Sequence, residues 1–194
     1  VLSGVGGDEL FYGYPTYRAT DLLLKLGPLV RCLFPFQGLA KLPLPNTGYM
    51  SLGEQLTRFF QACNHRPELA HTRWRQVFSR NEMASVIRPE YAVSSLDEIM
   101  DPQMRFFEEA HQMGYRGLDR FAYVDIKTWL VDYGLSLWDK TGMSASLEIR
   151  VPFLDMDFLQ HLFRVPMKFR KGRIGQKSML RKICGRSMPK SIVT

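Results

Sequence analysis

The first residues of the chain combine closely spaced glycines with two adjacent carboxylates, in the order Ser3-Gly4-Val5-Gly6-Gly7-Asp8-Glu9. Glycines let backbone N–H groups approach an anion without interference from a Cβ atom, and a helix that begins directly afterwards adds the positive end of its dipole. Because like charges repel, the two carboxylates do not bind phosphate themselves. They can hold a divalent cation such as Mg²⁺ that phosphate oxygens also ligate. The segment therefore predicts a site for a nucleotide or pyrophosphate bridged by a metal ion.

A simpler interpretation of the same segment stays open. Glycine-rich turns before helices are common, and acidic residues in the first turn of a helix stabilise its dipole without any metal ion. Short motifs of this kind also arise by chance. The spacing alone does not decide between the two interpretations.

A second group of residues suited to chemistry lies between Asp139 and Asp155, where charged and apolar side chains alternate. Arg150 can bind a carboxylate or a phosphate through two parallel N–H groups. Pro152 fixes the backbone where the chain leaves a helix, and Asp155 is expected to cap the next helix. Taken alone, the segment favours a purely structural salt-bridge cluster that caps helices, and an ion-paired turn packed beneath a site is the alternative. The charged residues of this group are Asp139, Lys140, Glu148, Arg150 and Asp155.

Composition narrows the possible classes of protein. The 194 residues are 45% apolar and 12% aromatic, which is enough for a full hydrophobic core. The formal net charge of +7 suits an anionic partner. Basic residues are dense only between Lys168 and Lys190, and no known nucleic-acid-binding motif accompanies them. The sequence therefore does not favour a nucleic acid as a partner.

The cysteines, histidines and apolar segments argue against disulfides, zinc and membranes. The three cysteines are far apart and odd in number, as in a reduced cytoplasmic protein, and the four histidines form no zinc-binding pattern. The longest apolar stretch, Leu22 to Phe36, is interrupted by charged residues and prolines, so we expect a buried or interface helix and no membrane span. No signal peptide is visible, and we predict a cytoplasmic protein.

The elements that position these residues are expected to be mainly α-helical, with one short N-terminal strand. Val1 and Leu2 are predicted to belong to a sheet whose other strands lie upstream, because so short a strand is not stable alone. Capping patterns and apolar periodicity predict the helices that follow. These helices are expected to begin near Ser51, Pro67, Ser79, Ser95 and Asp101-Pro102, after a loop over residues 35–48. The strongest helical period, from Leu118 to Trp138, places Ala122, Ile126, Trp129, Leu130, Tyr133 and Leu137 on one stripe.

Three blocks of the sequence carry its most recognisable pattern. They are Leu2-Ser3-Gly4-x-Gly6-Gly7-Asp8-Glu9-Leu10-Phe11-x-Gly13-Tyr14, Asp139-Lys140-x-x-Met143-Ser144-x-Ser146-Leu147-Glu148-x-Arg150-Val151-Pro152-Phe153-Leu154-Asp155, and Lys177-x-x-Leu180-Arg181 followed by Met188-Pro189-x-x-Ile192. In order and spacing, the three blocks together resemble the synthetase domain of the glutamine-dependent asparagine synthetases. Residues 15–117 match that family only in their helical character.

The resemblance implies an α/β parent fold of the PP-loop ATP pyrophosphatase class, similar to the adenine nucleotide alpha hydrolases. Residues 1–194 would be its C-terminal, mainly helical part, and the upstream PP-loop and the glutaminase domain are expected to be absent from them. The implied reaction adenylates a carboxylate, aspartate by default, releases pyrophosphate, and couples the acyl group to ammonia from glutamine. ATP and Mg²⁺ are the implied cofactors, and small molecules are the implied partners. A homodimer is left open, and the fragment alone is expected to be inactive.

The resemblance also implies roles for individual residues at the matching positions. Asp8 would hold Mg²⁺ on the pyrophosphate, and Glu9 would order the turn. Lys177 is a candidate for contact with phosphate, and an exposed helix lysine is the equally open alternative. The implied nucleotide-binding residues are Ser3, Gly4, Gly6, Arg150 and Lys177, with Asp139 and Glu148 supporting them.

Two departures from the family pattern concern catalysis. Val5 stands where asparagine synthetases usually carry a glutamate nearest the reacting acyl group, and a valine can neither transfer a proton nor orient an amine. The catalytic residue is therefore unknown, and an acceptor acid other than aspartate is plausible. The family also places a catalytic lysine just beyond the position of Thr194, so we expect these residues to lack that stabilisation of the leaving group.

Two functions of other classes stay as alternatives. One is a non-enzymatic helical interaction module that keeps the glycine turn as a relic of nucleotide binding. The other is RNA or DNA binding through residues 168–190, in which case affinity would fall steeply as salt rises.

Overall fold

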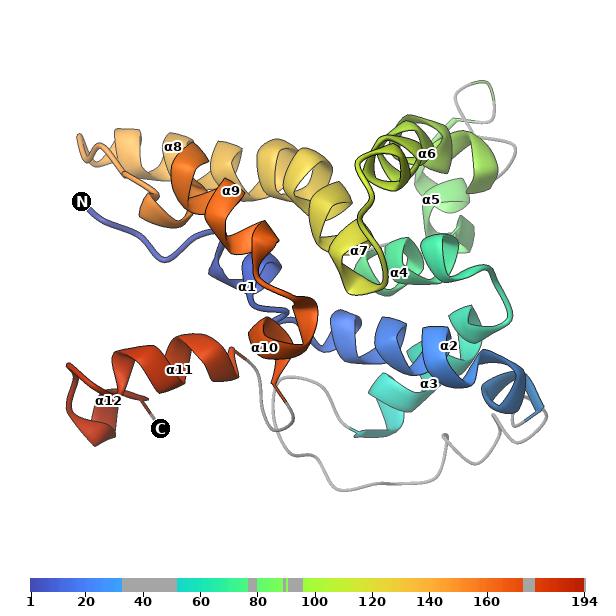
Figure 1. Cartoon of the computed structure of the whole chain (residues 1–194). Helices are drawn as coiled ribbons and strands as arrows, with labels where there is room; N and C mark the ends of the chain where they lie inside the picture. Colours follow the sequence, from blue (N-terminus) through green and yellow to red (C-terminus); the bar gives the residue numbers. More distant parts are fainter. Residues whose placement is uncertain (33–51, 77–79, 89, 91–95, 173–176, 194) are drawn as a thin grey trace. The chain divides into compact units, whose positions relative to one another are not determined.

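The computed structural model describes residues 1–32, 52–76, 80–88, 90, 96–172 and 177–193 (Figure 1). The chain divides into two compact units, one formed by residues 1–15 and 103–194 and the other by residues 16–102. Each unit has its own cluster of buried hydrophobic residues. The predicted loop over residues 35–48 lies outside the described residues.

The first unit contains the glycine turn and most of the helices. A single helical turn, α1 (Gly7–Leu10), follows the glycines, and α6 (Leu96–Gln112) enters this unit at Gln103. The chain is then helical without a break from residue 118 to residue 144, a run that begins with α7 and ends with α8 (Figure 1). The remaining elements of this unit are α7 (Leu118–Asp125), η3 (Ile126–Leu135), α8 (Ser136–Ser144), η4 (Pro152–Leu154), α9 (Met156–Arg164), α10 (Met167–Lys171), α11 (Ser178–Cys184) and α12 (Lys190–Val193).

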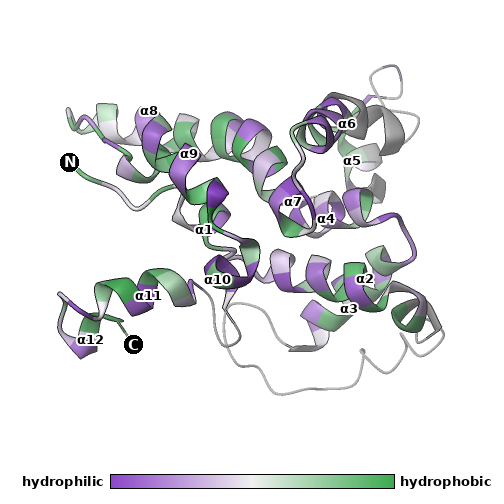
Figure 2. Cartoon of the chain, in the orientation of Figure 1, coloured by the Kyte–Doolittle hydropathy of each residue, from purple (hydrophilic) through white to green (hydrophobic). Residues whose placement is uncertain are grey.

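The core of the first unit forms around the residues that end the glycine turn. Leu10 and Phe11 are buried with Leu162 of α9, and the ring of Phe11 meets that of Phe153 edge to face at 6.0 Å. Hydrophobic residues alternate with hydrophilic ones along α9 and α11 (Figure 2), and their apolar sides face this cluster. Burial of α1 therefore fixes the turn to the core. The partly buried residues packed around the cluster are Ile126, Phe153, Leu159, Phe163, Met179 and Leu180.

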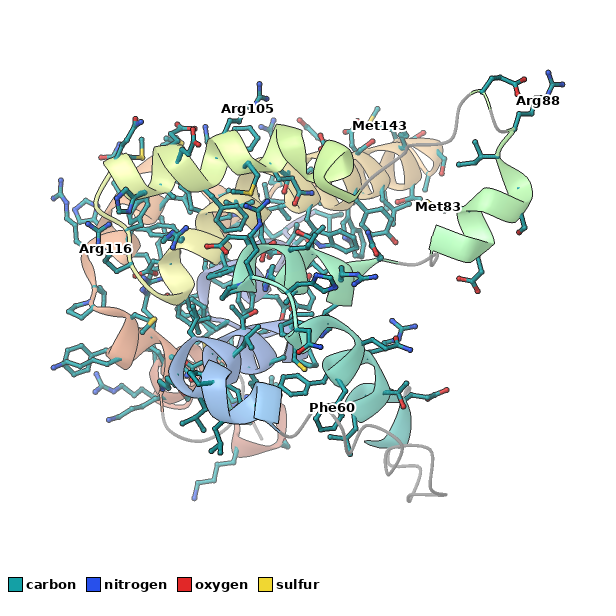
Figure 3. All side chains as sticks on the ribbon, turned by 90° about the vertical axis from the view of Figure 1, so that its right-hand side faces the viewer. Phe60, Met83, Arg88, Arg105, Arg116 and Met143 are labelled. Carbon is teal, nitrogen blue, oxygen red and sulfur yellow. The ribbon has the colours of Figure 1, made fainter. Side chains whose placement is uncertain are left out.

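The second unit is built from α2 (Pro15–Cys32), α3 (Leu52–Cys63), α4 (Pro67–Arg75) and α5 (Arg80–Val86). Trp74 of α4 stacks on Phe59 of α3 at 5.6 Å, and its indole N–H donates to the carbonyl of Arg58 at 3.1 Å. Phe60, labelled in Figure 3, packs against the same cluster. Helices are thus found near the predicted starts at Pro67 and Ser79, and Trp74 is buried.

The helix expected within Leu22 to Phe36 is present as part of α2, although it is kinked. Leu26 has a non-helical φ of −123°, two residues before Pro28. Proline lacks the N–H that would bond four residues back and its ring clashes with that carbonyl, which explains the kink. Leu23 and Val30 are buried, whereas residues 33–36 lie outside the described part.

The predicted N-terminal strand is wrong for the described residues. Leu2 forms one isolated parallel bridge with Arg150, in which the Arg150 N–H donates to the Val1 carbonyl at 2.8 Å and the Ser3 N–H donates to the Arg150 carbonyl at 2.9 Å. The glycine turn begins directly after this bridge and the 3-10 helix η4 follows two residues after Arg150, so the pairing cannot extend into a ladder. No strand occurs in the part of the chain that the structure describes.

Two predictions about helices also need correction. The stripe over residues 118–138 assumes 3.6 residues per turn, but η3 is a π-helix, whose hydrogen bonds to the fifth residue place more residues in each turn. Later positions of the stripe consequently turn outward, and Tyr133 and Leu137 are 54% and 45% exposed. In addition, α6 continues through Asp101-Pro102 instead of beginning there.

Within the described residues, no helix combines the length and the apolar character that a membrane crossing requires.

Candidate functional site

The glycine turn is held tightly by its own backbone and by η4. Gly6 has a φ of +90°, and a Cβ atom at this residue would lie 2.5 Å from Cδ2 of Leu154, so a glycine is required for both conformation and space. The Gly7 N–H donates to the Gly4 carbonyl at 3.1 Å, and the Val5 N–H donates to the Ser3 hydroxyl at 3.4 Å. Two of the amides that could meet an anion are thus engaged within the turn. Binding by the amides around Gly4 and Gly6 stays a prediction.

Asp8 and Lys177, predicted as a metal ligand and a phosphate contact, lie together. Lys177 Nζ donates to Asp8 Oδ2 at 2.9 Å, although the two residues are 169 positions apart in the sequence. Their side chains are 31% and 33% exposed, so the pair is accessible to a ligand. Lys177 is the residue directly before α11. Its backbone φ is +55°, a left-handed conformation that is unusual for a residue other than glycine. It is therefore not an ordinary solvent-exposed lysine within a helix.

Gly13 provides the space for this pair. Its N–H donates to the Asp8 carbonyl at 2.7 Å, which closes the segment after α1 into a tight turn. A Cβ atom at residue 13 would lie 2.6 Å from Cε of Lys177 and 2.8 Å from Cγ of Asp8. Only a glycine lets the backbone approach both side chains this closely.

The other predicted supporting residues are only partly brought together. Arg150 and Glu148 form an ion pair at 2.6 Å, but both side chains are 71% exposed, so the pair contributes little to stability. Arg150 is linked to Ser3 through its backbone carbonyl. Asp139 is exposed on α8, and the described contacts include no ion pair between it and Arg150 or Glu148. The structure therefore pairs two of these three charged residues with each other, and their role in supporting a site stays a prediction.

Glu9 and Asp155, two other residues with predicted roles, both lie in the first unit. Glu9 is 1% exposed within α1, so its side chain faces the protein interior, and its role in ordering the turn stays a prediction. Asp155 caps α9, since its Oδ1 accepts a hydrogen bond from the Phe158 N–H at 3.0 Å.

A buried network of hydrogen bonds around Arg170 adjoins the candidate site and was not predicted from the sequence. The guanidinium of Arg170 forms an ion pair with Asp119, and it donates from Nη1 to the Leu10 carbonyl at 3.3 Å and from Nε to the Val165 carbonyl at 3.1 Å. The Tyr12 hydroxyl also donates to Asp119 Oδ1, at 2.5 Å. Burial raises the pKa of Tyr12, the Arg170 guanidinium partly opposes this shift, and the Asp119 carboxylate adds to it. The hydroxyl is therefore neutral at physiological pH.

No spacing in the sequence could have revealed this network, because its members are 51 and 107 residues apart. In sequence, Arg170 is one of many basic residues between Lys168 and Lys190. The side chain of Arg170 is fully buried, so it is not part of a basic surface. The ammonium group of Lys177 is paired with the carboxylate of Asp8. Both facts weaken residues 168–190 as a nucleic-acid-binding surface.

The residues present fit a magnesium ion that is bound together with phosphates. Mg²⁺ in phosphate sites typically takes one or two protein carboxylates and completes its shell with phosphate oxygens and water. Asp8 supplies one accessible carboxylate, and Lys177 supplies a positive charge beside it. The described residues contain no group of three or more side chains that would hold a metal without such a ligand.

Comparison with known proteins gives the family. Residues 1–194 match the family described as Asparagine synthase. A Mycobacterium bovis protein named "Putative asparagine synthetase (glutamine-hydrolyzing)" is 29% identical over 94% of this chain and 26% of its own length. The Bacillus subtilis protein named "Asparagine synthetase (glutamine-hydrolyzing) 1" is 28% identical over 99% of this chain and 29% of its own length. The chain thus spans less than a third of each relative, and no solved structure matches it. The chain belongs to the asparagine synthase family.

Proposed function

We propose that these residues are the C-terminal part of an ATP-dependent synthetase domain that forms an amide bond. The domain would have the α/β fold of the PP-loop ATP pyrophosphatases, with its PP-loop and a glutaminase domain outside residues 1–194. In the whole protein, a carboxylate attacks the α-phosphorus of ATP to give an acyl-adenylate and pyrophosphate. Ammonia from glutamine then attacks the acyl carbon, and AMP leaves. Aspartate is the default acid, and the fragment alone is inactive.

The observation that carries this proposal is the pairing of Asp8 with Lys177 beside the glycine turn. Family membership alone is also compatible with a protein that has lost the family's activity. The accessible side chains of Asp8 and Lys177, 2.9 Å apart, support a retained binding site. A carboxylate next to an ammonium group matches the charges of a magnesium-bound pyrophosphate, since Asp8 can ligate the metal while Lys177 binds the phosphate oxygens.

The chemical role of these residues is stabilisation of the leaving group. Mg²⁺ and ATP, when bound, supply the electrophilic phosphorus and neutralise part of the triphosphate charge. Lys177 lowers the energy of the departing pyrophosphate, on which negative charge develops. Ser3 and Gly4 line the adenylate, while Arg150 lies beside them through its backbone link to Ser3. Val5 can accept no proton from the attacking amine, so a base for this step does not lie at residue 5.

Exchange of labelled pyrophosphate into ATP tests the proposal in the full-length protein. We expect exchange that requires Mg²⁺ and a carboxylic acid, with aspartate tried first and other amino acids next. Asp8→Ala and Lys177→Ala should each reduce exchange at least tenfold, whereas Lys182→Ala, which removes an exposed lysine from α11, should not. No exchange with any acid, together with unchanged ATP affinity in Asp8→Ala, would instead support a non-enzymatic interaction module.

The proposal includes a cytoplasmic protein that acts on small molecules. A homodimer stays a prediction, which light scattering on the full-length protein can test.

A further inference from the structure

Arg170 is fully buried, and each of its three guanidinium nitrogens donates a hydrogen bond. A buried charge is costly unless it is paired and hydrogen-bonded. Arg170 meets this condition through Asp119 and the carbonyls of Leu10 and Val165, and its guanidinium lies 5.2 Å from the ring centre of Tyr12. Such an arrangement is directional, so it fixes the segments that supply these groups.

The first segment fixed by Arg170 carries Asp8. Leu10 is the last residue of α1, the turn that contains Asp8, and its carbonyl accepts a hydrogen bond from Arg170. Tyr12 is held from two sides, by the guanidinium over its ring and by Asp119 at its hydroxyl. Tyr12 also has a left-handed φ of +53°, a conformation that is rarely stable without such contacts. Gly13, which makes space for the ion pair, follows directly.

The second segment fixed by Arg170 leads to Lys177. Arg170 lies in α10, and the carbonyl of its neighbour Lys171 accepts a hydrogen bond from the Ser178 hydroxyl at 2.9 Å. Ser178 is the first residue of α11 and follows Lys177 in the chain. The position of Lys177 is thus tied to α10 by a contact one residue away.

We propose that Arg170 is a positioning residue that holds Asp8 and Lys177 at the separation needed to bind one magnesium pyrophosphate group. Arg170 touches neither the ligand nor the reacting atoms, and it acts through the backbone at Leu10 and the side chains of Tyr12 and Asp119. The inference rests on the proposed function of the Asp8 and Lys177 pair. It adds that their geometry depends on a buried charge at the junction of α1, α7 and α10.

Binding of magnesium pyrophosphate to the full-length protein, measured by calorimetry, tests this inference without turnover. Arg170→Lys keeps the charge but loses the forked donors, and Tyr12→Phe removes only the hydroxyl. We expect each variant to bind magnesium pyrophosphate roughly ten- to hundredfold more weakly, since misplacement by about 1 Å has effects of this size. Arg164→Lys, a matched change at an exposed position of α9, should bind as the wild type does.

A double-mutant cycle separates positioning from simple stabilisation of the fold. If Arg170 positions Lys177, then Lys177→Met should cost much less affinity in the Arg170→Lys background than in the wild type. Additive losses, or unchanged affinity in both Tyr12→Phe and Arg170→Lys at a temperature where they are folded, would overturn the inference. If Arg170→Lys does not fold, the cycle is made with Tyr12→Phe. Failure of the wild type itself to bind magnesium pyrophosphate would instead refute the proposed function.

Discussion

Replacing Gly13 with alanine tests the candidate site most directly. A Cβ atom at residue 13 would lie 2.6 Å from Cε of Lys177 and 2.8 Å from Cγ of Asp8, well inside van der Waals contact. One or both side chains must therefore move away. Their exposed fractions, 33% and 31%, leave them room to move into solvent, so the ion pair yields before the backbone does.

The magnitudes follow from the exposure of the pair. A partly exposed ion pair contributes at most about 1 kcal/mol to the free energy of unfolding, so Gly13→Ala should lower that free energy by about 1 kcal/mol. Pyrophosphate binding needs both groups to face one ligand, and displacement of either by about 1 Å is expected to reduce exchange roughly ten- to hundredfold. Function should thus fall far more than stability.

Pyrophosphate exchange and urea unfolding of the full-length protein measure the two effects. Gly27→Ala is the matched control, because the nearest atom to a Cβ at this helical residue is Cδ1 of Leu23 at 4.0 Å. Alanine should raise stability there by up to about 1 kcal/mol and leave exchange unchanged. If Gly13→Ala exchanged pyrophosphate at the wild-type rate with the wild-type dependence on Mg²⁺, the paired side chains would not be the binding site.

Three other changes have outcomes that the structure specifies. Asp8→Asn should raise the Mg²⁺ concentration for half-maximal exchange at least tenfold, because an amide is a weaker Mg²⁺ ligand than a carboxylate; an unchanged magnesium titration would exclude Asp8 as the metal ligand. Leu162→Ala, which empties part of the core beneath α1, should lower the free energy of unfolding by about 2–5 kcal/mol in urea titrations, and a loss below about 1 kcal/mol would contradict its burial. Because the pKa of Tyr12 is raised, the folded state binds the hydroxyl proton more tightly than the unfolded state does. This tighter binding stabilises the folded state fully below a pH of about 10, and the stabilisation is lost as pH rises further. Tyr12→Phe should therefore show a smaller loss of stability above pH 10 than the wild type, and parallel curves would refute the assignment.

The helical elements were largely predictable because they depend on local patterns. Capping by Asp155 and proline at the start of α4 are short-range signals, and both occur in the structure. The π-helix η3 could not be predicted from periodicity, since its hydrogen-bond pattern changes the number of residues per turn without a sequence signal of its own. The prediction of an N-terminal strand was wrong for a related reason. Two apolar residues indicate an extended segment, but a strand also needs paired neighbours, and within the described residues Leu2 has only the isolated bridge to Arg150.

The candidate site was predictable as a set of residues and not as an arrangement. The glycine turn and Lys177 could be chosen from residue type and family resemblance. Their contact depends on how α11 returns to α1, across 169 residues. Arg170 gave no signal, because a buried arginine in a basic segment has the same local sequence as an exposed one. Burial and long-range pairing distinguish it, and both are properties of the packed chain.

The ion pair between Asp8 and Lys177 also bears on how metal and phosphate bind. A magnesium ion alone would have to displace the ammonium group from the Asp8 carboxylate, which leaves Lys177 without its partner. Pyrophosphate alone would compete with the same carboxylate for Lys177. When both arrive together, the carboxylate gains the metal and the ammonium gains the phosphate, so neither charge is left uncompensated. The geometry of this pair therefore favours joint binding of metal and pyrophosphate over binding of either one first.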